Sequence, residues 1–381
     1  MKETKSVLMV IPTFYPVVGG SEKQCFELSS HLAAAGVKVV VLTRNAGQSP
    51  ESEEINGFKI IRKKVFGPLF PDSLLFMAKV FLHILREKDS FDVVHAHMLT
   101  SAALAALIAG KLSGKKTVFK LAGGKGVDEI SLSEKKFSGK IKLFLLKLFK
   151  PKLLVMNREV FDWLKSGPYR EIPLELFKNG VDTSRYRTPL LDEKNRAKEK
   201  LNAYSTNLLF VGRLSPEKRM KEFIEIFSEI LCDQTYKENI KLLIVGSGPQ
   251  EAEIRGAVKA LGLGENVIMF GHKYELLDYY WASEIFILPS VSEGLSNSML
   301  EALSCGLAIL AGKVGAARDL IKEGENGWLF DPFNRNEIKL CLKKAIENKN
   351  LKDISDRNRA LAVNNYSMNA VAKELLKIYG E

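Results

Sequence analysis

Short apolar segments alternate with helical segments along nearly the whole chain, and this alternation restricts the fold more than any other feature. Strands that are apolar on both faces and separated by helices are typical of a parallel sheet covered on both sides. In the first half, this pattern predicts strands at residues 6–11, 37–43, 58–63, 92–95, 117–121 and 153–156, and helices at residues 22–35, 74–86, 101–112 and 135–149.

The alternation starts again after a polar stretch at residues 188–200 that lacks a strand pattern. A chain of 381 residues fits two domains of about 150 residues each. The expected elements of the second half are strands at 207–211, 240–245, 267–270, 285–288 and 307–311, and helices at 220–231, 250–260, 276–282, 297–304 and 369–379. The sequence therefore predicts two α/β domains, residues 1–185 and 186–365, followed by a C-terminal helix within residues 366–381.

Composition narrows the class of protein. Apolar residues make up 46% of the chain and charged residues 27%, which is typical of globular proteins and excludes a disordered chain. The four cysteines are widely spaced and form no Cys-x-x-Cys pair, which favours reduced core thiols in a cytosolic protein over disulfides or a zinc site. No uncharged run reaches the roughly 20 residues that a membrane-spanning helix needs.

The loops after the predicted strands are the candidate sites, because ligands of open parallel sheets bind beyond the carboxyl ends of the strands. Gly19 and Gly20 precede a helix after the first strand, where backbone N–H groups can approach an anion; a flexible turn is the alternative. Arg213 and Lys218 follow the strand at 207–211. The planar guanidinium of Arg213 and the compact ammonium of Lys218 suit a diphosphate, although basic side chains more often lie on the surface in contact with solvent.

The strand at 240–245 ends in Gly246-Ser247-Gly248-Pro249. This run resembles the start of a dinucleotide fingerprint, but Glu251 occupies the third glycine position, so a dehydrogenase is disfavoured. A tight turn between a strand and a helix explains both glycines.

Two glutamates lie eight residues apart around the predicted start of the helix at 297–304. Glu293 lies in the loop, whereas Glu301 lies within the helix beside apolar neighbours. A partly buried carboxylate needs a partner, for which sugar or ribose hydroxyls are suitable, and the free N–H groups at 294–297 can receive a phosphate. The alternative is a solvated Glu301 with Glu293 as a carboxylate favoured by the helix dipole.

Four motifs in this order resemble one family. EGLSNSMLEALSCG at 293–306, VGRLSPEK at 211–218, GSGP at 246–249 and NGVDTSRY at 179–186 resemble the retaining nucleotide-sugar glycosyltransferases of the GT-B fold, family four. The resemblance implies two Rossmann-like βαβ domains that face each other across a cleft, with the acceptor on the N-terminal domain and the nucleotide sugar on the C-terminal domain. It also implies that the last helix crosses back to the N-terminal domain.

The resemblance further implies roles for individual residues. Arg213 and Lys218 would contact the diphosphate, Glu293 would bind sugar hydroxyls, and Glu301 would bind the ribose, while the loop that contains Lys273 would hold the base. The implied donor-binding residues are Gly19, Gly20, Arg213, Lys218, Gly246, Lys273, Glu293, Gly294, Leu295, Ser296 and Glu301.

The implied reaction moves a hexose-type sugar from a UDP- or GDP-sugar to a hydroxyl of a glycan or lipid-linked acceptor, in cell-envelope or exopolysaccharide synthesis. The sugar would keep its anomeric configuration, because the acceptor would attack from the face that the diphosphate leaves. The implied catalytic residues are Glu293, Arg213 and Lys218, and neither a metal nor a cofactor is expected. One departure concerns a histidine that many members carry after the strand at 117–121, because Ala122 stands there. His97 or Lys120 is a candidate for this role, whereas a structural role for His97 is the alternative.

Two other functions remain open. A nucleotide-sugar 2-epimerase of the same fold would need further catalytic groups, and the chain has five histidines. A nucleic-acid-binding protein would use the net charge of +11. Residues 1–185 carry 29 basic and 18 acidic side chains, whereas the remainder carries 27 of each. Since no aromatic platform or reading motif accompanies this excess, no nucleic-acid partner is expected.

The excess of positive charge is densest at residues 135–152, which contain seven lysines and no acid. Helical spacing places an apolar set of side chains on one side of this segment and a basic set on the opposite side. The apolar set is Phe137, Ile141, Phe144, Leu145 and Leu148. The basic set is Lys136, Lys140, Lys147 and Lys150. Such a helix is typical of contact with an anionic membrane, so a cytoplasmic protein at the inner face of the membrane is expected. An ordinary amphipathic helix packed on its sheet has the same spacing, and that alternative stays open.

Overall fold

The chain folds into two compact α/β units in a computed structural model that describes residues 5–380 except 18, 46, 48, 67–69, 125, 127, 204 and 205. The N-terminal unit spans Met1–Gly180 together with Met368–Glu381, and the C-terminal unit spans Val181–Ser367. The limits of the units therefore fall after residues 180 and 367, where the sequence placed them after 185 and 365.

The N-terminal unit contains an eight-stranded sheet of order β3-β4-β2-β1-β5-β6-β7-β8. All neighbours are parallel except β3 and β4, which pair antiparallel. The central strands are Val- and Leu-rich and buried on both faces, as helices on both sides require. The strands are β1 (Ser6–Val10), β2 (Lys38–Asn45), β3 (Ser52–Ile55), β4 (Phe58–Lys64), β5 (Val93–His97), β6 (Lys116–Lys120), β7 (Lys152–Val155) and β8 (Leu174–Leu176).

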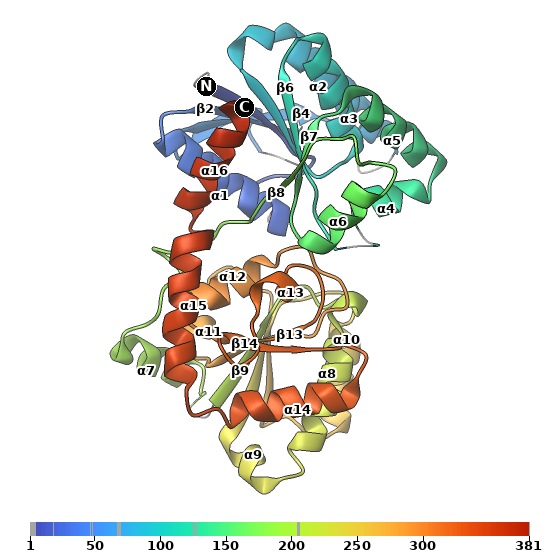
Figure 1. Ribbon diagram of the computed structural model, residues 1–381. Coiled ribbons are helices and arrows are strands. Elements are labelled where there is room, and N and C mark those ends of the chain that lie inside the picture. The colour runs from blue at the N-terminus through green and yellow to red at the C-terminus, as the bar shows by residue number, and fades with distance from the viewer. Residues whose placement is uncertain are drawn as a thin grey trace. The chain divides into compact units, whose positions relative to one another are not determined.

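Helices cover both faces of this sheet (Figure 1). α1 and α16 share one apolar core with the sheet, and α2, α3, α5 and α6 share the core on the opposite face. The C-terminal helix thus packs against the first helix of the chain, within the N-terminal unit to which the resemblance assigned it. The helices are α1 (Gly20–Ala34), α2 (Phe70–Arg86), η1 (Lys88–Ser90), α3 (Ser101–Leu112), α4 (Glu129–Glu134), α5 (Phe137–Phe149), α6 (Arg158–Ser166) and α16 (Met368–Gly380).

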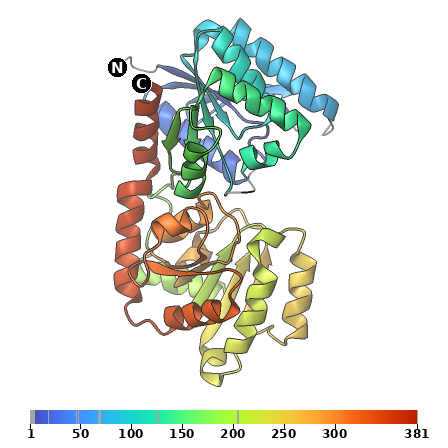
Figure 2. The same ribbon diagram turned by 45° about the vertical axis from the view of Figure 1, so that its right-hand side comes forward.

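The C-terminal unit contains a six-stranded parallel sheet of order β11-β10-β9-β12-β13-β14. Side chains of α8, α10 and α14 form the apolar core on one face, while α12 packs on α15; the layers are visible in Figure 2. The strands are β9 (Thr206–Val211), β10 (Ile240–Val245), β11 (Val267–Gly271), β12 (Ile285–Leu288), β13 (Ala308–Gly312) and β14 (Gly327–Phe330). The helices are α7 (Leu191–Lys200), η2 (Pro216–Lys218), α8 (Met220–Ile230), α9 (Gln234–Asn239), α10 (Glu251–Ala260), α11 (Leu277–Trp281), α12 (Asn297–Ser304), α13 (Ala317–Leu320), α14 (Arg335–Ile346) and α15 (Leu351–Tyr366).

The helix predicted at residues 135–149 is α5 (Phe137–Phe149), and the short helix α4 (Glu129–Glu134) before it was not predicted. Asp128 caps α4 by accepting hydrogen bonds from the N–H groups of Ile130 and Ser131. The chain then turns so closely that a Cβ at Gly139 would lie 2.0 Å from the carbonyl oxygen of Ser133. The polar strand β3 and the polar helix α7 were missed because neither carries an apolar pattern.

Two further sequence expectations concern cysteines and membrane spans. All four cysteines are free, but Cys232 is exposed, so the interpretation of core thiols holds for only three of them. Among the described residues, no helix combines the length and the apolar character needed to cross a membrane.

Candidate functional site

The loops after the strands of the C-terminal sheet are tied to one another at the carboxyl edge. The loop after β9 bonds to that after β10, since the N–H of Leu214 donates to the carbonyl of Ser247 at 2.9 Å. The loop after β12 also bonds to the loop after β9, since the N–H of Val291 donates to the carbonyl of Glu217 at 2.9 Å. The side chains that these loops carry are therefore held in one place.

Lys218 and Glu293 form an ion pair within this cluster of loops. Both side chains are largely buried, and the hydroxyl of Ser290 donates to the same carboxylate oxygen, Oε1, at 2.8 Å. The other oxygen, Oε2, has no hydrogen-bond partner among the residues that the structure describes. The sequence assigned these two residues separate contacts, whereas the structure brings them together and leaves one carboxylate oxygen available to a hydroxyl.

Glu301 is 5% exposed, so the alternative that it is a solvated helix residue is wrong. The hydroxyl of Tyr280 on α11 donates to its Oε2 at 2.7 Å. Burial, followed by the charge of Glu301, holds the pKa of this hydroxyl well above its usual value, so Tyr280 remains a donor. Sequence reasoning missed Tyr280; the aromatic run at 279–281 in a short helix was the available signal.

The start of α12 lies between these two glutamates. Ser296 is the N-cap residue, and its hydroxyl accepts from the N–H of Met299 at 3.4 Å. The backbone of Gly315 packs closely against the preceding loop. A Cβ at this position would lie 1.9 Å from the carbonyl oxygen of Glu293, and the φ of Gly315 is +52°. A phosphate role for the N–H groups of Gly294, Leu295 and Ser296 stays a prediction.

The glycines after β10 are required by packing. A Cβ at Gly246 would lie 1.8 Å from the carbonyl oxygen of Gly212, and one at Gly248 would lie 2.3 Å from that of Leu214. The φ of Gly246 is +140°, a conformation that favours glycine. This geometry agrees with the tight turn predicted from the sequence, and a direct contact between Gly246 and the donor stays a prediction.

Two further cations occupy the same edge of the sheet. Arg213 follows β9 and Lys273 follows β11, and both side chains are exposed. Neither side chain makes an ion pair or hydrogen bond with any described residue. Arg213 and Lys273 are therefore available to an anion, whereas Lys218 is already paired with Glu293. In the described part of the chain, no group of three or more His, Cys, Asp or Glu side chains could hold a metal ion.

The glycine pair of the N-terminal unit lies at the start of α1, with Gly19 as N-cap and Gly20 as the first residue. Glu22 occupies this helix end, because the hydroxyl of Thr13 donates to its Oε1 and a Cβ at Gly19 would lie 2.5 Å from its Oε2. A carboxylate is stabilised there by the helix dipole. This acid was not among the predicted site residues, and it would have to share the helix end with any bound phosphate.

His97 ends β5 and is 2% exposed. Its ring stacks on that of His95 with centroids 4.5 Å apart, and its Nε2 has no hydrogen-bond partner in the described part of the chain. Burial, then neighbouring His95 and Lys120, lowers the pKa of His97 well below its usual value, so the ring is neutral. This placement suits a structural histidine, and a catalytic role stays a prediction.

A carboxylate contacts Ala122, the residue that stands where the resemblance places a histidine. Both oxygens of Glu129 accept from the N–H of Ala122, at 3.1 and 3.0 Å. Burial raises the pKa of Glu129 to about 7, against the lowering effect of its backbone hydrogen bonds. Sequence reasoning missed this residue, although the Asp128-Glu129 pair at a helix start was a visible signal. The start of α4 therefore carries an acid whose pKa is raised to about 7 by burial.

Two doubly wound parallel sheets, with the charged side chains gathered beyond the strand ends, define a protein of the GT-B class. Residues 192–362 match the family described as glycosyl transferases group 1, and residues 18–185 match glycosyltransferase family 4. The chain belongs to family 4 of the glycosyltransferases.

Individual relatives agree with this assignment. An uncharacterised glycosyltransferase of Methanocaldococcus jannaschii is 26% identical over 98% of each chain. A UDP-Gal:α-D-GlcNAc-diphosphoundecaprenol α-1,3-galactosyltransferase of Escherichia coli is 24% identical, over 76% of this chain and 75% of its own. HepE of Anabaena, solved with UDP-glucose, has the same fold with a TM-score of 0.79 at 18% identity, over 98% of this chain and 99% of its own.

Proposed function

We propose that this chain transfers a hexose-type sugar from a UDP- or GDP-sugar to a hydroxyl group of a glycan or lipid-linked acceptor. The observation that carries the proposal is the contact of Lys218, Ser290 and Glu293 at the carboxyl edge of the C-terminal sheet. A nucleotide sugar needs cations for its diphosphate and acceptors for its hydroxyls. Glu293 offers an acceptor oxygen, and exposed Arg213 and Lys273 at the same edge offer cations beside the paired Lys218. The E. coli relative named for UDP-Gal and the Anabaena structure with UDP-glucose support this class of donor.

The proposed reaction retains the configuration of the sugar. The acceptor oxygen bonds to the anomeric carbon on the face from which the diphosphate leaves, and the bond between that carbon and the diphosphate oxygen breaks. The proton of the acceptor hydroxyl passes to the departing diphosphate. Arg213 and Lys218 stabilise the charge that develops on this group, so the proposal requires neither a metal nor a cofactor.

The proposed acceptor is lipid-linked or part of a growing glycan, in cell-envelope or exopolysaccharide synthesis. The E. coli relative is named for an acceptor on diphosphoundecaprenol, which supports this choice. Such an acceptor places the proposed reaction at the inner face of the cell membrane.

A thermal-shift panel of UDP- and GDP-sugars, with RNA and DNA as controls, tests the donor. A ligand at about 100 times its dissociation constant should stabilise the protein by about 2.7 kcal/mol. One nucleotide sugar should stand out from the others. If none stabilises the protein while nucleic acid does, the proposal is wrong.

Product analysis tests the reaction. With the selected donor and an acceptor, NMR of the product should show the anomeric configuration of the donor, and a chelator should leave the rate unchanged. An inverted product would exclude the retaining mechanism, and a rate lost on chelation would exclude the metal-free one. Conversion of the donor to its 2-epimer without an acceptor would show an epimerase instead.

A further inference from the structure

α5 carries a stripe of apolar side chains that face solvent. The exposed fractions are 82% for Phe137, 51% for Ile141, 63% for Phe144 and 60% for Leu148. Leu143 and Leu146, on another side of the helix, fill the core instead. The helix therefore packs on the core, as the alternative left open by the sequence had it, but through other side chains than the predicted stripe.

Lysines border the stripe without any acid on the same helix. Lys136 and Lys140 are exposed, and neither side chain makes an ion pair or hydrogen bond with a described residue. The other two predicted lysines have partners: Lys147 lies over the ring of Tyr169 at 4.8 Å, and Lys150 pairs with Glu171 at 2.8 Å. The available positive charge is thus concentrated at the N-terminal half of α5.

The stripe is presented by a helix that is fixed to the unit. Gly139 allows the backbone of α5 to approach the carbonyl of Ser133 at the end of α4. The amino group of Lys142 donates to the carbonyl of Leu99 at 2.9 Å, and α5 also contacts α3. Because these contacts use other sides of the helix, the apolar stripe remains outside the packed core.

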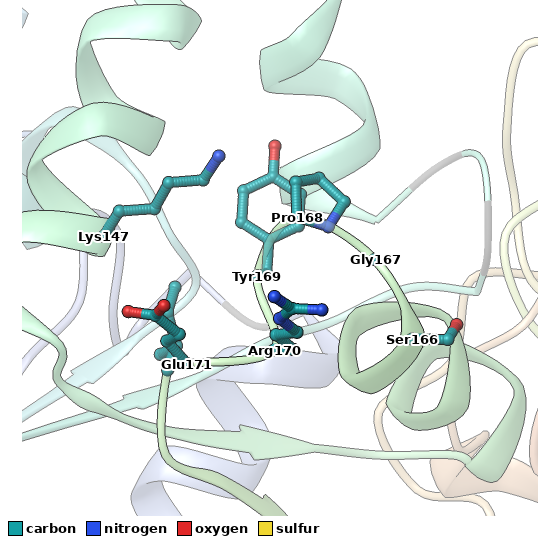
Figure 3. A pocket seen from close by; sticks show the side chains of 8 residues that line it. Lys147, Ser166, Gly167, Pro168, Tyr169, Arg170 and Glu171 are labelled. Carbon is teal, nitrogen blue, oxygen red and sulfur yellow. The ribbon is translucent and has the colours of Figure 1, made fainter.

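A hollow of about 560 Å³ adjoins the C-terminal end of α5, lined by Lys147 and residues 166–172. Figure 3 shows the charged groups of Lys147, Arg170 and Glu171 around the ring of Tyr169. Lys147 and Arg170 are the cations of this hollow. Its acid, Glu171, is already paired with Lys150. The hollow continues the basic border to the other end of the helix.

We propose that the stripe of Phe137, Ile141, Phe144 and Leu148 docks on an anionic lipid bilayer. The apolar side chains enter the boundary between headgroups and acyl chains, and the bordering lysines contact lipid phosphates. The observation that selects a bilayer is charge complementarity, because α5 itself contains lysines and no acid, and Glu171 beside its C-terminal end is paired with Lys150. The proposal deepens the proposed function, on which it rests for the lipid-linked acceptor.

Vesicle binding tests the docking with the full-length protein and without donor or acceptor. We expect cosedimentation with phosphatidylglycerol vesicles that weakens as salt rises, and little with phosphatidylcholine vesicles. Absence of binding to the anionic vesicles would overturn the proposal. Since donor binding is measured separately by thermal shift, failure here and failure of the proposed function are distinguishable.

Two matched pairs of variants locate the contact. Leu148→Glu should weaken vesicle binding at least about tenfold, whereas Leu340→Glu, at a leucine of α14 that is 55% exposed, should not change it. Lys140→Gln should weaken binding about fivefold, whereas Lys259→Gln on α10 should not.

Two outcomes would contradict this assignment. Equal vesicle binding by Leu148→Glu and Leu340→Glu would remove the stripe from the contact. A wild-type dimer that Leu148→Glu converts to a monomer, without vesicle binding, would show that the stripe joins two copies of the chain.

Discussion

The two units place different chemistry at the carboxyl edges of their sheets. In the C-terminal unit, Lys218 and Glu293 neutralise each other, and exposed Arg213 and Lys273 add positive charge. In the N-terminal unit, burial lowers the pKa of Lys120 to about 8 and raises that of Glu129 to about 7. One edge is dominated by charged side chains, and the other by groups whose pKa values are shifted by burial.

The difference arises from what each carboxylate contacts. Glu293 receives an ammonium and a hydroxyl on one carboxylate oxygen. Glu129 receives only backbone N–H donors at the start of α4, with Asp128 nearby as a like charge. The amino group of Lys142, which also faces Glu129, donates instead to the carbonyl of Leu99.

The largest effect should follow Glu293→Gln. The amide keeps the size of the side chain and can accept from Ser290, but it removes the charge paired with Lys218. We expect the transfer rate to fall about 100- to 1,000-fold, measured as kcat with saturating donor. Glu251→Gln, at the surface pair with Arg255, is the matched control and should keep the rate. An unchanged rate in both variants would mean that the charged cluster takes no part in the reaction.

Gly246→Ala should destabilise the C-terminal edge by about 3 kcal/mol or more. The new Cβ would lie 1.8 Å from the carbonyl oxygen of Gly212, at a φ of +140°. Urea unfolding measures the change. Gly264→Ala, where nothing lies within 4 Å of the Cβ, should unfold nearly as the wild type does. Equal unfolding of the two variants would exclude packing as the reason for Gly246.

Glu301→Ala should weaken donor binding about 100-fold, because a charged acceptor of hydroxyl groups is lost. Tyr280→Phe keeps the carboxylate but removes its 2.7 Å hydrogen bond, and should weaken binding about tenfold. Titration calorimetry with the donor measures both. Wild-type affinity in Glu301→Ala would disprove the ribose assignment.

Glu129→Gln should have the smallest effect, seen as a change in pH dependence. If the carboxylate acts on the acceptor, wild-type kcat/KM rises as pH passes about 7, where Glu129 ionises, and the variant loses this rise. Glu159→Gln, also in the first turn of a helix, should keep the wild-type profile. A pH profile of Glu129→Gln that matches the wild type would leave Glu129 a structural residue.

Stability gives a second readout of the same group. The folded state holds the proton of Glu129 more tightly than the unfolded state does, since its pKa is raised from 4.5 to about 7. The free energy of unfolding therefore falls as pH rises through this window. Glu129→Gln should remove this loss and be more stable than the wild type at pH 8 by about 1–3 kcal/mol.

The pattern of apolar residues predicted most of the fold. The predicted bounds agree with β12, α3 and α12 and come within a few residues for the other central strands, because local periodicity records which side chains are buried. β3 was missed because its burial is low, whereas β14 and α14 were missed although their apolar side chains are buried. For the site, the sequence pointed to Lys218, Glu293 and Glu301 but not to their partners.

Those partners depend on strand order, which the linear sequence does not display. β9 lies between β10 and β12, so a loop near residue 218 meets one near residue 293. Tyr280 on α11 donates to Glu301 on α12, so this contact also joins two separate elements. Each contact follows from crossover connections that place distant strands side by side.

The sequence by itself determined the helical stripe of α5 and its lysines, because spacing and charge are local properties. Only the tertiary structure decided which side of that helix is buried. Leu143 and Leu146 fill the core, and this packing turns Phe144 and Leu148 to solvent. A helix has one orientation on its sheet, and the side chains that pack best against the neighbouring elements decide which other side chains are left for a partner.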